Sequence, residues 1–256
     1  MTPPLPRRLL AEFLGTALLV AVVVGSGIMA ATLSLDDTGL QLLENSTATV
    51  LGLTVLILVF GPVSGAHFNP VVSLADWWLH RSTGGGLAGR DLGPYALAQV
   101  AGAIGGAILA NLTFALPAVT MSTKHRDAGH LWLGETVATA GLVLLVFALV
   151  RTGRAALAAP AVGAYIGAAY WFTSSTSFAN PAVTVGRAFT DTFAGISPGS
   201  VPAFVGFQVL GLLIGTAAVV ALYPNPATPV TGREAVDPAP TGAATPTPKL
   251  RPSSPN

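Results

Sequence analysis

Six mostly apolar stretches constrain the fold of this 256-residue chain more than any other feature. They cover residues 9–33, 47–61, 94–116, 131–150, 156–173 and 201–223. A helix of about 20 apolar residues crosses the roughly 30 Å hydrocarbon core of a bilayer. Only 9% of the residues are charged, against about 25% in an ordinary soluble domain. We therefore expect an all-α membrane protein with six transmembrane helices, the first of them retained rather than cleaved as a signal peptide.

The basic residues predict the orientation of these helices. Six spans place both termini on one side of the membrane, and positively charged residues are enriched on the cytoplasmic side. The terminal side carries Arg7, Arg8, Arg81, Arg90, Arg151, Arg154, Arg233, Lys249 and Arg251, and the other side carries only Lys124, Arg126 and Arg187. This distribution predicts a multi-pass protein of the cell membrane, the plasma membrane in a bacterium, with both termini in the cytoplasm.

The last part of the chain, residues 224–256, differs in composition from the rest. It holds nine prolines among Ala, Thr, Gly and Ser. A segment of this kind cannot bury a core and is predicted to be disordered. The chain therefore divides into a transmembrane domain of residues 1–223 and a Pro-rich cytoplasmic tail.

Three short motifs of the first half of the chain recur in the same order in the second half. The pairs are Leu-Ala-Glu12 with Leu-Gly-Glu135, His-Phe-Asn69-Pro with Phe-Ala-Asn180-Pro, and Gln99-x-x-Gly with Gln208-x-x-Gly. The halves, about 7–117 and 130–223, each hold three spans. Because three is odd, the second half must insert with the opposite orientation. Inverted repeats of this kind place a functional site near the midplane, where the halves meet.

An Asn-Pro pair follows the second span of each half and precedes only about ten mostly apolar residues, 71–79 and 182–189. Ten helical residues rise about 15 Å, which is half of the hydrocarbon core. Asn is a favoured N-cap and Pro a favoured first helical residue. Two half-helices are therefore expected to begin at Asn69-Pro70-Val71 and Asn180-Pro181-Ala182 and to meet at the midplane from opposite faces.

Two helix N-termini that face each other create a distinctive electrostatic environment. Each carries about half a positive charge and unpaired N–H groups, and the amides of Asn69 and Asn180 add hydrogen-bond donors. A cation or a proton is repelled at such a point, whereas a neutral hydroxyl-bearing solute can accept hydrogen bonds. Irregular backbone at 63–68 and 174–179 would present carbonyl groups to a water-filled path.

These residues resemble the major intrinsic proteins, the family of aquaporin and aquaglyceroporin channels. The resemblance covers residues 9–223 and is most specific at Ser64-Gly-Ala-His-Phe-Asn-Pro and Asn180-Pro-Ala. It implies six helices and two re-entrant half-helices around a narrow pore in each subunit of a homotetramer, with passive flow of small uncharged solutes. It also implies that Glu12 and Glu135 support the pore loops through hydrogen bonds, in keeping with the cost of an unpaired carboxylate in a membrane.

Two residues depart from the family pattern. The first motif reads Asn69-Pro70-Val71 in place of Asn-Pro-Ala. Val183 stands three residues after the second Asn, where the family usually has an arginine. Arg187 lies one turn further on, and we expect it to serve the end of the helix. Because Val offers neither hydrogen-bond donors nor a positive barrier, a less polar pore entrance is expected.

The other filter positions follow from counting along the chain from the two Asn-Pro motifs. The filter residues expected from the resemblance are Thr49 (or Leu51, if the intervening loop is two residues shorter than usual), Ala168, Ser177 and Val183. Small residues at these positions predict a roomy and weakly polar filter.

The stretch 163–183 is also similar to bacterial channels associated with arsenic-resistance genes. This resemblance implies permeation of arsenous acid, a small neutral trihydroxide, with glycerol and water as further solutes. An orthodox water channel remains the alternative within the family. An ion-coupled secondary transporter is the alternative from another class, but it would need charges inside the spans, and few occur there besides the two glutamates.

The sequence predicts no enzyme. The four histidines are scattered, neither HExxH nor GxSxG occurs, and the chain has no cysteine. Neither a cofactor nor a metal site is expected. A net charge of +1 makes nucleic acid an unsuitable partner, so the expected partners are the lipid bilayer, the solutes and further copies of the chain.

Overall fold

The computed structural model describes residues 3–223, and all regular secondary structure in that range is helical. The six long helices are α1 (Leu5–Leu33), α2 (Thr38–Ser64), α4 (Leu92–Thr113), α5 (Gly129–Arg151), α6 (Ala158–Phe172) and α8 (Val201–Leu222). The two short helices are α3 (Pro70–His80) and α7 (Pro181–Gly186). Four 3-10 turns, η1 (Gly89–Asp91), η2 (Ala155–Leu157), η3 (Arg187–Phe189) and η4 (Pro198–Ser200), extend α4, α6, α7 and α8. The tail predicted to be disordered, 224–256, lies outside the described residues.

The six long helices, counted with their 3-10 extensions, are long and apolar enough to cross a membrane. The expected fold class, an all-α membrane protein with six spans and two shorter helices between them, is confirmed. The second half-helix is shorter than expected, because α7 ends at Gly186 and continues only as the 3-10 turn Arg187–Phe189.

The second span begins at Thr38, nine residues before the start expected from hydropathy. The Asp37 side chain caps it by accepting a hydrogen bond from the Leu40 backbone N–H at 2.8 Å. Its first turns are polar, but their side chains are paired: Gln41 Nε2 donates to the Ser34 carbonyl at 2.7 Å. Hydropathy alone missed these turns because their polar residues lower the local hydropathy to that of a loop, and the sequence does not show that the side chains are paired.

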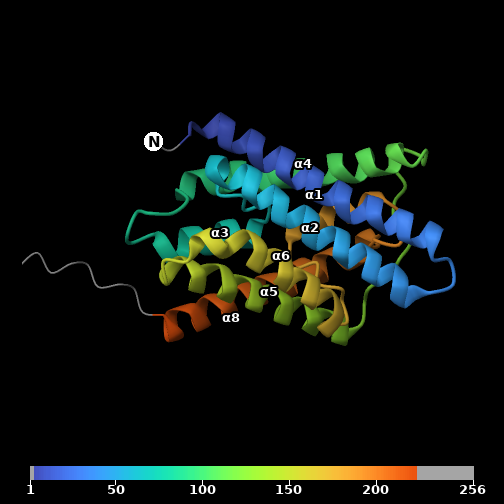
Figure 1. Cartoon of the computed structure of the whole chain (residues 1–256). Helices are drawn as coiled ribbons and strands as arrows, with labels where there is room; N and C mark the ends of the chain where they lie inside the picture. The colour runs from blue at the N-terminus through green and yellow to red at the C-terminus, as the bar shows by residue number, and fades with distance from the viewer. Residues whose placement is uncertain (1–2, 224–256) are drawn as a thin grey trace, which may run out of the picture. The chain divides into compact units, whose positions relative to one another are not determined.

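The helices of the two halves pack in equivalent ways. In the first half α1 contacts α2 and α4, and in the second half α5 contacts α6 and α8. In Figure 1, α1 crosses the upper part of the view, while α5 and α8 lie in the lower part. Contacts between α2 and α6 join the halves, and each short helix also packs against the last long helix of the other half, α3 on α8 and α7 on α4. The half-helices are therefore held by both repeats.

Glycines allow the closest helix contacts. Gly106 of α4 lies directly against α1, where a Cβ atom at this position would collide with the carbonyl oxygen of Ala17. Gly215 of α8 occupies the equivalent place against α5, where a Cβ would lie 2.7 Å from the carbonyl oxygen of Ala140. Small residues let helix backbones approach in this way within membranes, so both repeats use the same packing device.

We expect Gly215→Val to destabilise the protein by about 1–3 kcal/mol, because the added methyl groups must push α8 away from α5. Gly206→Val is the matched control, since Gly206 lies on the same helix and a Cβ there meets nothing within 4 Å. The measurement is thermal unfolding of the purified protein in detergent. A shift in melting temperature of about 5 °C is expected for the first variant alone, and equal shifts in both variants would contradict the packing argument.

Candidate functional site

Both half-helices begin at the proline of their Asn-Pro motif, and the preceding asparagine caps each one. The Asn69 side-chain oxygen accepts a hydrogen bond from the Val71 backbone N–H at 3.1 Å. The Asn180 side-chain oxygen accepts from the backbone N–H groups of Ala182 and Val183 at 3.0 and 3.2 Å. The capping chemistry expected from the sequence thus fixes the oxygen of each amide and turns its nitrogen away from the helix.

The two amide nitrogens cross between the halves. Asn69 Nδ2 donates to the carbonyl of Ala179 at 2.8 Å, and Asn180 Nδ2 donates to the carbonyl of Phe68 at 2.7 Å. Each bond joins the cap of one half-helix to the loop that precedes the other. The N-termini of α3 and α7 are therefore held face to face, as the inverted repeat requires.

Glu12 of α1 holds the loop before α3. It is fully buried, and its Oε1 accepts hydrogen bonds from Ser64 Oγ at 2.6 Å and from the His67 backbone N–H at 3.0 Å. Its Oε2 accepts from the Phe68 backbone N–H and from Gln99 Nε2, both at 2.7 Å. Four donors converge on one carboxylate, which explains how a glutamate is tolerated inside the protein.

Glu135 of α5 holds the loop before α7 in the same way. It is also fully buried, and it accepts from the backbone N–H groups of Phe178 and Ala179 at 2.9 and 2.8 Å. Gln208 Nε2 donates to it at 2.6 Å and lies 2.9 Å from Thr184 Oγ1 on α7. The sequence showed the Gln99 and Gln208 motifs as repeated elements, but it gave no role to the two glutamines. Their repetition beside the glutamate motifs was the signal for this second role.

The two loops share an unusual backbone. Residues with positive φ, other than those in distant turns, are Gly65, Ala66 and Phe68 in the first loop and Thr176, Ser177 and Ala179 in the second. Non-glycine residues in this conformation cost about 1–3 kcal/mol each and persist only where the surroundings enforce them. The N–H groups of Phe68 and Ala179, which are among these residues, each donate a hydrogen bond to Glu12 and Glu135 respectively. By accepting these hydrogen bonds, the two carboxylates offset the backbone strain in the loops that lead into α3 and α7.

A cavity of about 520 Å³ lies beside these loops, and both Asn69 and Asn180 line it. Thr49 of α2 lines it as well, whereas Leu51, the alternative expected at this position, is 64% exposed. The rest of the wall is mostly apolar and includes Leu19, Val23, Leu53, Leu142, Val162 and Ile166. The cavity wall therefore offers a solute a few polar groups in mostly apolar surroundings.

The remaining expected filter residues divide into two groups. Ser177 and Val183 line the cavity, but Ala168 does not, because it lies on an exposed part of α6. Tyr170 lines the cavity from α6 instead, with its hydroxyl 3.3 Å from Thr49 Oγ1. Two residues along a helix are about 200° apart around its axis, so an error of two in the register moves the expected side chain to the opposite face.

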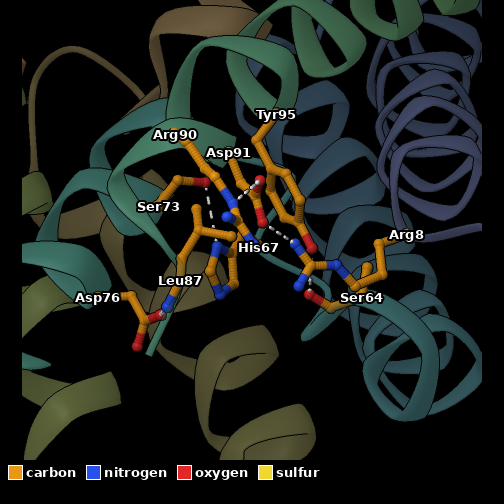
Figure 2. Close-up of polar contacts among 9 residues, drawn as sticks. All are labelled: Arg8, Ser64, His67, Ser73, Asp76, Leu87, Arg90, Asp91 and Tyr95. Atoms are coloured by element: carbon orange, nitrogen blue, oxygen red, sulfur yellow. Dashed lines mark hydrogen bonds and ion pairs between the residues drawn. The ribbon is translucent and has the colours of Figure 1, made fainter. Parts of the chain in front are cut away.

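A second cavity of about 590 Å³ adjoins this path, and His67 and Asp76 line both. Figure 2 shows the contacts around it. His67 Nδ1 lies 3.0 Å from Ser73 Oγ on α3, and the Leu87 backbone N–H donates to Asp76 Oδ2 at 2.6 Å. The second contact ties the loop after α3 to the half-helix, so this loop forms part of the wall of the second cavity.

Arg8 and Tyr95 form the opposite wall of this second cavity. Arg8 Nη2 donates to Asp91 Oδ2 at 2.6 Å, and its guanidinium carbon lies 5.3 Å from the centre of the Tyr95 ring. The Tyr95 hydroxyl donates to the Ser64 carbonyl at 3.0 Å (Figure 2). These contacts join the start of α1 to α4 and to the end of α2, and they pair the charge of Arg8.

Two arginines from different segments lie near Phe178, in the loop before α7. The guanidinium carbon of Arg126 lies 4.9 Å, and that of Arg187 3.4 Å, from the centre of the Phe178 ring. Arg126 Nε donates to the Gly195 carbonyl at 3.1 Å, and burial lowers the pKa of Arg126 from its ordinary value. Arg187 caps the end of α7, as expected, and it is also buried and lines the main cavity.

An apolar path lined by two facing half-helix caps is the arrangement of a membrane channel with the aquaporin fold. The particular family follows from comparison with known proteins. The chain belongs to the major intrinsic protein family, whose family model matches residues 2–177.

Individual relatives agree with this assignment. The chain is 50% identical over 236 residues to "Aquaglyceroporin AqpS" of Rhizobium meliloti, a match that covers 92% of this chain and 98% of the relative. It is 33% identical over 226 residues to "Glycerol uptake facilitator protein" of Pseudomonas aeruginosa, covering 77% and 78% of the two chains. The crystal structure of the aquaglyceroporin from Plasmodium falciparum matches with a TM-score of 0.63 over 86% of this chain and 96% of that one. At 20% identity, this last match bears on the fold alone.

We expect Glu135→Leu to destabilise the protein strongly, because it leaves the Phe178 and Ala179 N–H groups without an acceptor. An unpaired buried donor costs about 1–3 kcal/mol. Glu135→Gln keeps one acceptor oxygen, so thermal unfolding in detergent should rank wild type above Glu135→Gln and Glu135→Leu last. Asp36→Asn, at an exposed turn, is the control. A wild-type melting temperature for Glu135→Leu would be incompatible with the proposed support of the loop.

Proposed function

We propose that this protein is a passive channel for small uncharged solutes, with arsenous acid as the leading solute and glycerol and water behind it. The observation that carries the proposal is that Val183, at the position where the family usually has an arginine, lines the main cavity together with Asn180. The relatives named for aquaglyceroporin and glycerol uptake support passage of small polyols.

The half-helix caps favour neutral solutes over cations. Each asparagine amide has two N–H hydrogens, and one on each side is used in the crossing bonds to Ala179 and Phe68. The second hydrogen remains as a donor for a solute oxygen in the cavity. Because two helix N-termini add positive potential at the same point, a hydroxyl oxygen is stabilised there and a cation is repelled.

The proposed filter is Thr49, Ser177 and Val183, with Tyr170 in place of Ala168. Ser177 lines the cavity, and its buried hydroxyl oxygen has no hydrogen-bond partner within residues 3–223. Val183 contributes size without polarity. Arsenous acid carries three hydroxyl groups and no charge, which suits a filter of this composition. The chain also has no cysteine, so it offers no thiol to trap trivalent arsenic during passage.

The wider organisation is part of the same proposal. Residues 1–223 form the channel domain, built from inverted repeats at about 7–117 and 130–223, and residues 224–256 form a cytoplasmic tail. Both termini face the cytoplasm of a bacterial cell, as the nine-to-three distribution of basic residues favours. The functional unit is a homotetramer with one pore in each subunit.

The test is stopped-flow light scattering on proteoliposomes that contain the full-length protein, with empty liposomes as the reference. Rapid entry of arsenous acid and glycerol at neutral pH, independent of any ion gradient, is expected. Water flux alone would indicate an orthodox water channel with a narrower pore. Entry that requires a proton or sodium gradient would indicate a secondary transporter and would refute the channel.

We expect Val183→Arg to reduce arsenous acid and glycerol flux about tenfold, which corresponds to about 1.4 kcal/mol in the barrier. The longer side chain narrows the path and adds a positive charge. Val183→Thr is the matched control, because it keeps the size of the residue and should keep the flux near that of the wild type. Unchanged flux through Val183→Arg would count against Val183 as a filter residue.

A further inference from the structure

Arg187 occupies a position on the pore wall that its place in the sequence did not suggest. It is 3% exposed, and it lines the main cavity together with Val183. It is the C-cap residue of α7, four positions after Val183. Residues four apart lie on the same face of a helix, so Arg187 follows Val183 along the wall by about one turn, or 5.4 Å.

The surroundings of Arg187 fix the side chain but leave much of its guanidinium group unpaired. Nε donates to the Ala194 carbonyl at 2.5 Å, and the group stacks on the Phe178 ring. Within residues 3–223, this is its only side-chain hydrogen bond, and no carboxylate oxygen lies within 4.0 Å. A guanidinium carries five N–H donors, so the four on the two terminal nitrogens have no hydrogen-bond partner within residues 3–223.

The neighbouring arginine has a different role. Arg126 does not line the cavity, and its side chain donates to the carbonyls of Gly195 and Ser175 at 3.1 and 3.5 Å. It lies near the same Phe178 ring and adds positive charge behind it. The Phe178 ring therefore positions Arg187, and of the two arginines only Arg187 lines the cavity.

We propose that Arg187 is a charge-selective residue of this pore, which adds to the half-helix caps and acts one helical turn beyond the position at which the family usually has its arginine. Its positive charge repels cations and protons, and its free N–H groups receive the hydroxyl oxygens of neutral solutes. Val183 leaves the pore wide at the usual filter position. The positive charge that the family usually has there is supplied one turn further along the wall, by Arg187. The inference rests on the proposed channel function.

This arrangement separates two properties that a single arginine at position 183 would combine. Size selection falls to Val183, Ser177 and Thr49, which carry no charge. Charge selection falls to Arg187, which is held flat against the aromatic ring and does not need to narrow the path. A wide neutral pore can then exclude cations, which a channel in an energised membrane requires.

The experiment compares proton leak and glycerol flux through proteoliposomes that contain full-length variants. Proton entry is driven by a potassium diffusion potential and followed with an internal pH dye. Arg187→Gln, which removes the charge, is expected to raise the proton leak at least about tenfold over the wild type. Arg187→Lys, which keeps the charge, should stay near the wild type. Lys124→Gln removes a nearby charge that does not line the cavity and is the matched control.

A proton leak through folded Arg187→Gln equal to that of the wild type would overturn the inference. So would an equal rise in Lys124→Gln, because the barrier would then belong to the surface charge in general. Glycerol and arsenous acid entry through the wild type tests the channel itself. Absence of that entry would remove the proposed function, whereas entry without any effect of Arg187→Gln would remove only this inference.

Arg187→His keeps the test decisive if Arg187→Gln does not fold. The ordinary pKa of histidine is about 6.5, and burial together with the nearby Arg126 lowers it at this position, so the same folded protein carries the charge only at low pH. The leak relative to wild type at the same pH should rise as the pH is raised from about 4.5 to 8. A purely structural role for Arg187 predicts a leak ratio that does not change with pH, and that result would refute the proposal.

Discussion

Two buried carboxylates support the rest of this structure. Glu12 and Glu135 each collect backbone N–H groups from a loop that enters the membrane region without regular secondary structure. Such backbone is tolerated within a membrane only where its polar groups are satisfied. The N–H groups of Phe68 and Ala179, both in the left-handed conformation, are among those bound. Without the carboxylates of Glu12 and Glu135 as acceptors, neither loop could hold the conformation that leads into its half-helix.

The asparagine caps depend on these loops and complete the site. Because Asn69 and Asn180 use their oxygens to cap their own helices, their nitrogens are free to bind the opposite loop. The crossing bonds fix the distance between the two N-termini, and with it the place where positive potential is greatest. The close contacts of Gly106 and Gly215 bring α4 and α8, which carry the glutamine partners of the glutamates, near to α1 and α5. The helix packing, the loop conformation and the positive potential at the half-helix N-termini thus depend on the same set of residues, which occurs once in each half.

Asymmetry between the repeats distinguishes this pore. The first loop has His67 near Ser73 and is joined to a polar second cavity with Asp76. The second loop has Phe178 at the equivalent position, with two arginines near its ring. The two ends of the path therefore differ in charge, although the centre is nearly symmetric. The proposed division of size and charge selection between Val183 and Arg187 follows from this difference.

The sequence by itself determined the number of spans, the duplication and the starts of both half-helices. These features depend on local properties: the length of an apolar stretch, and the capping preference of Asn followed by Pro. Only the tertiary structure decided that Tyr170 rather than Ala168 lines the cavity, because that face depends on where α6 ends and on how the next loop folds back. It also decided that Arg187 is buried beside the path. That position is set by Phe178 and Ala194, and no local pattern around residue 187 records which side chains will pack against it.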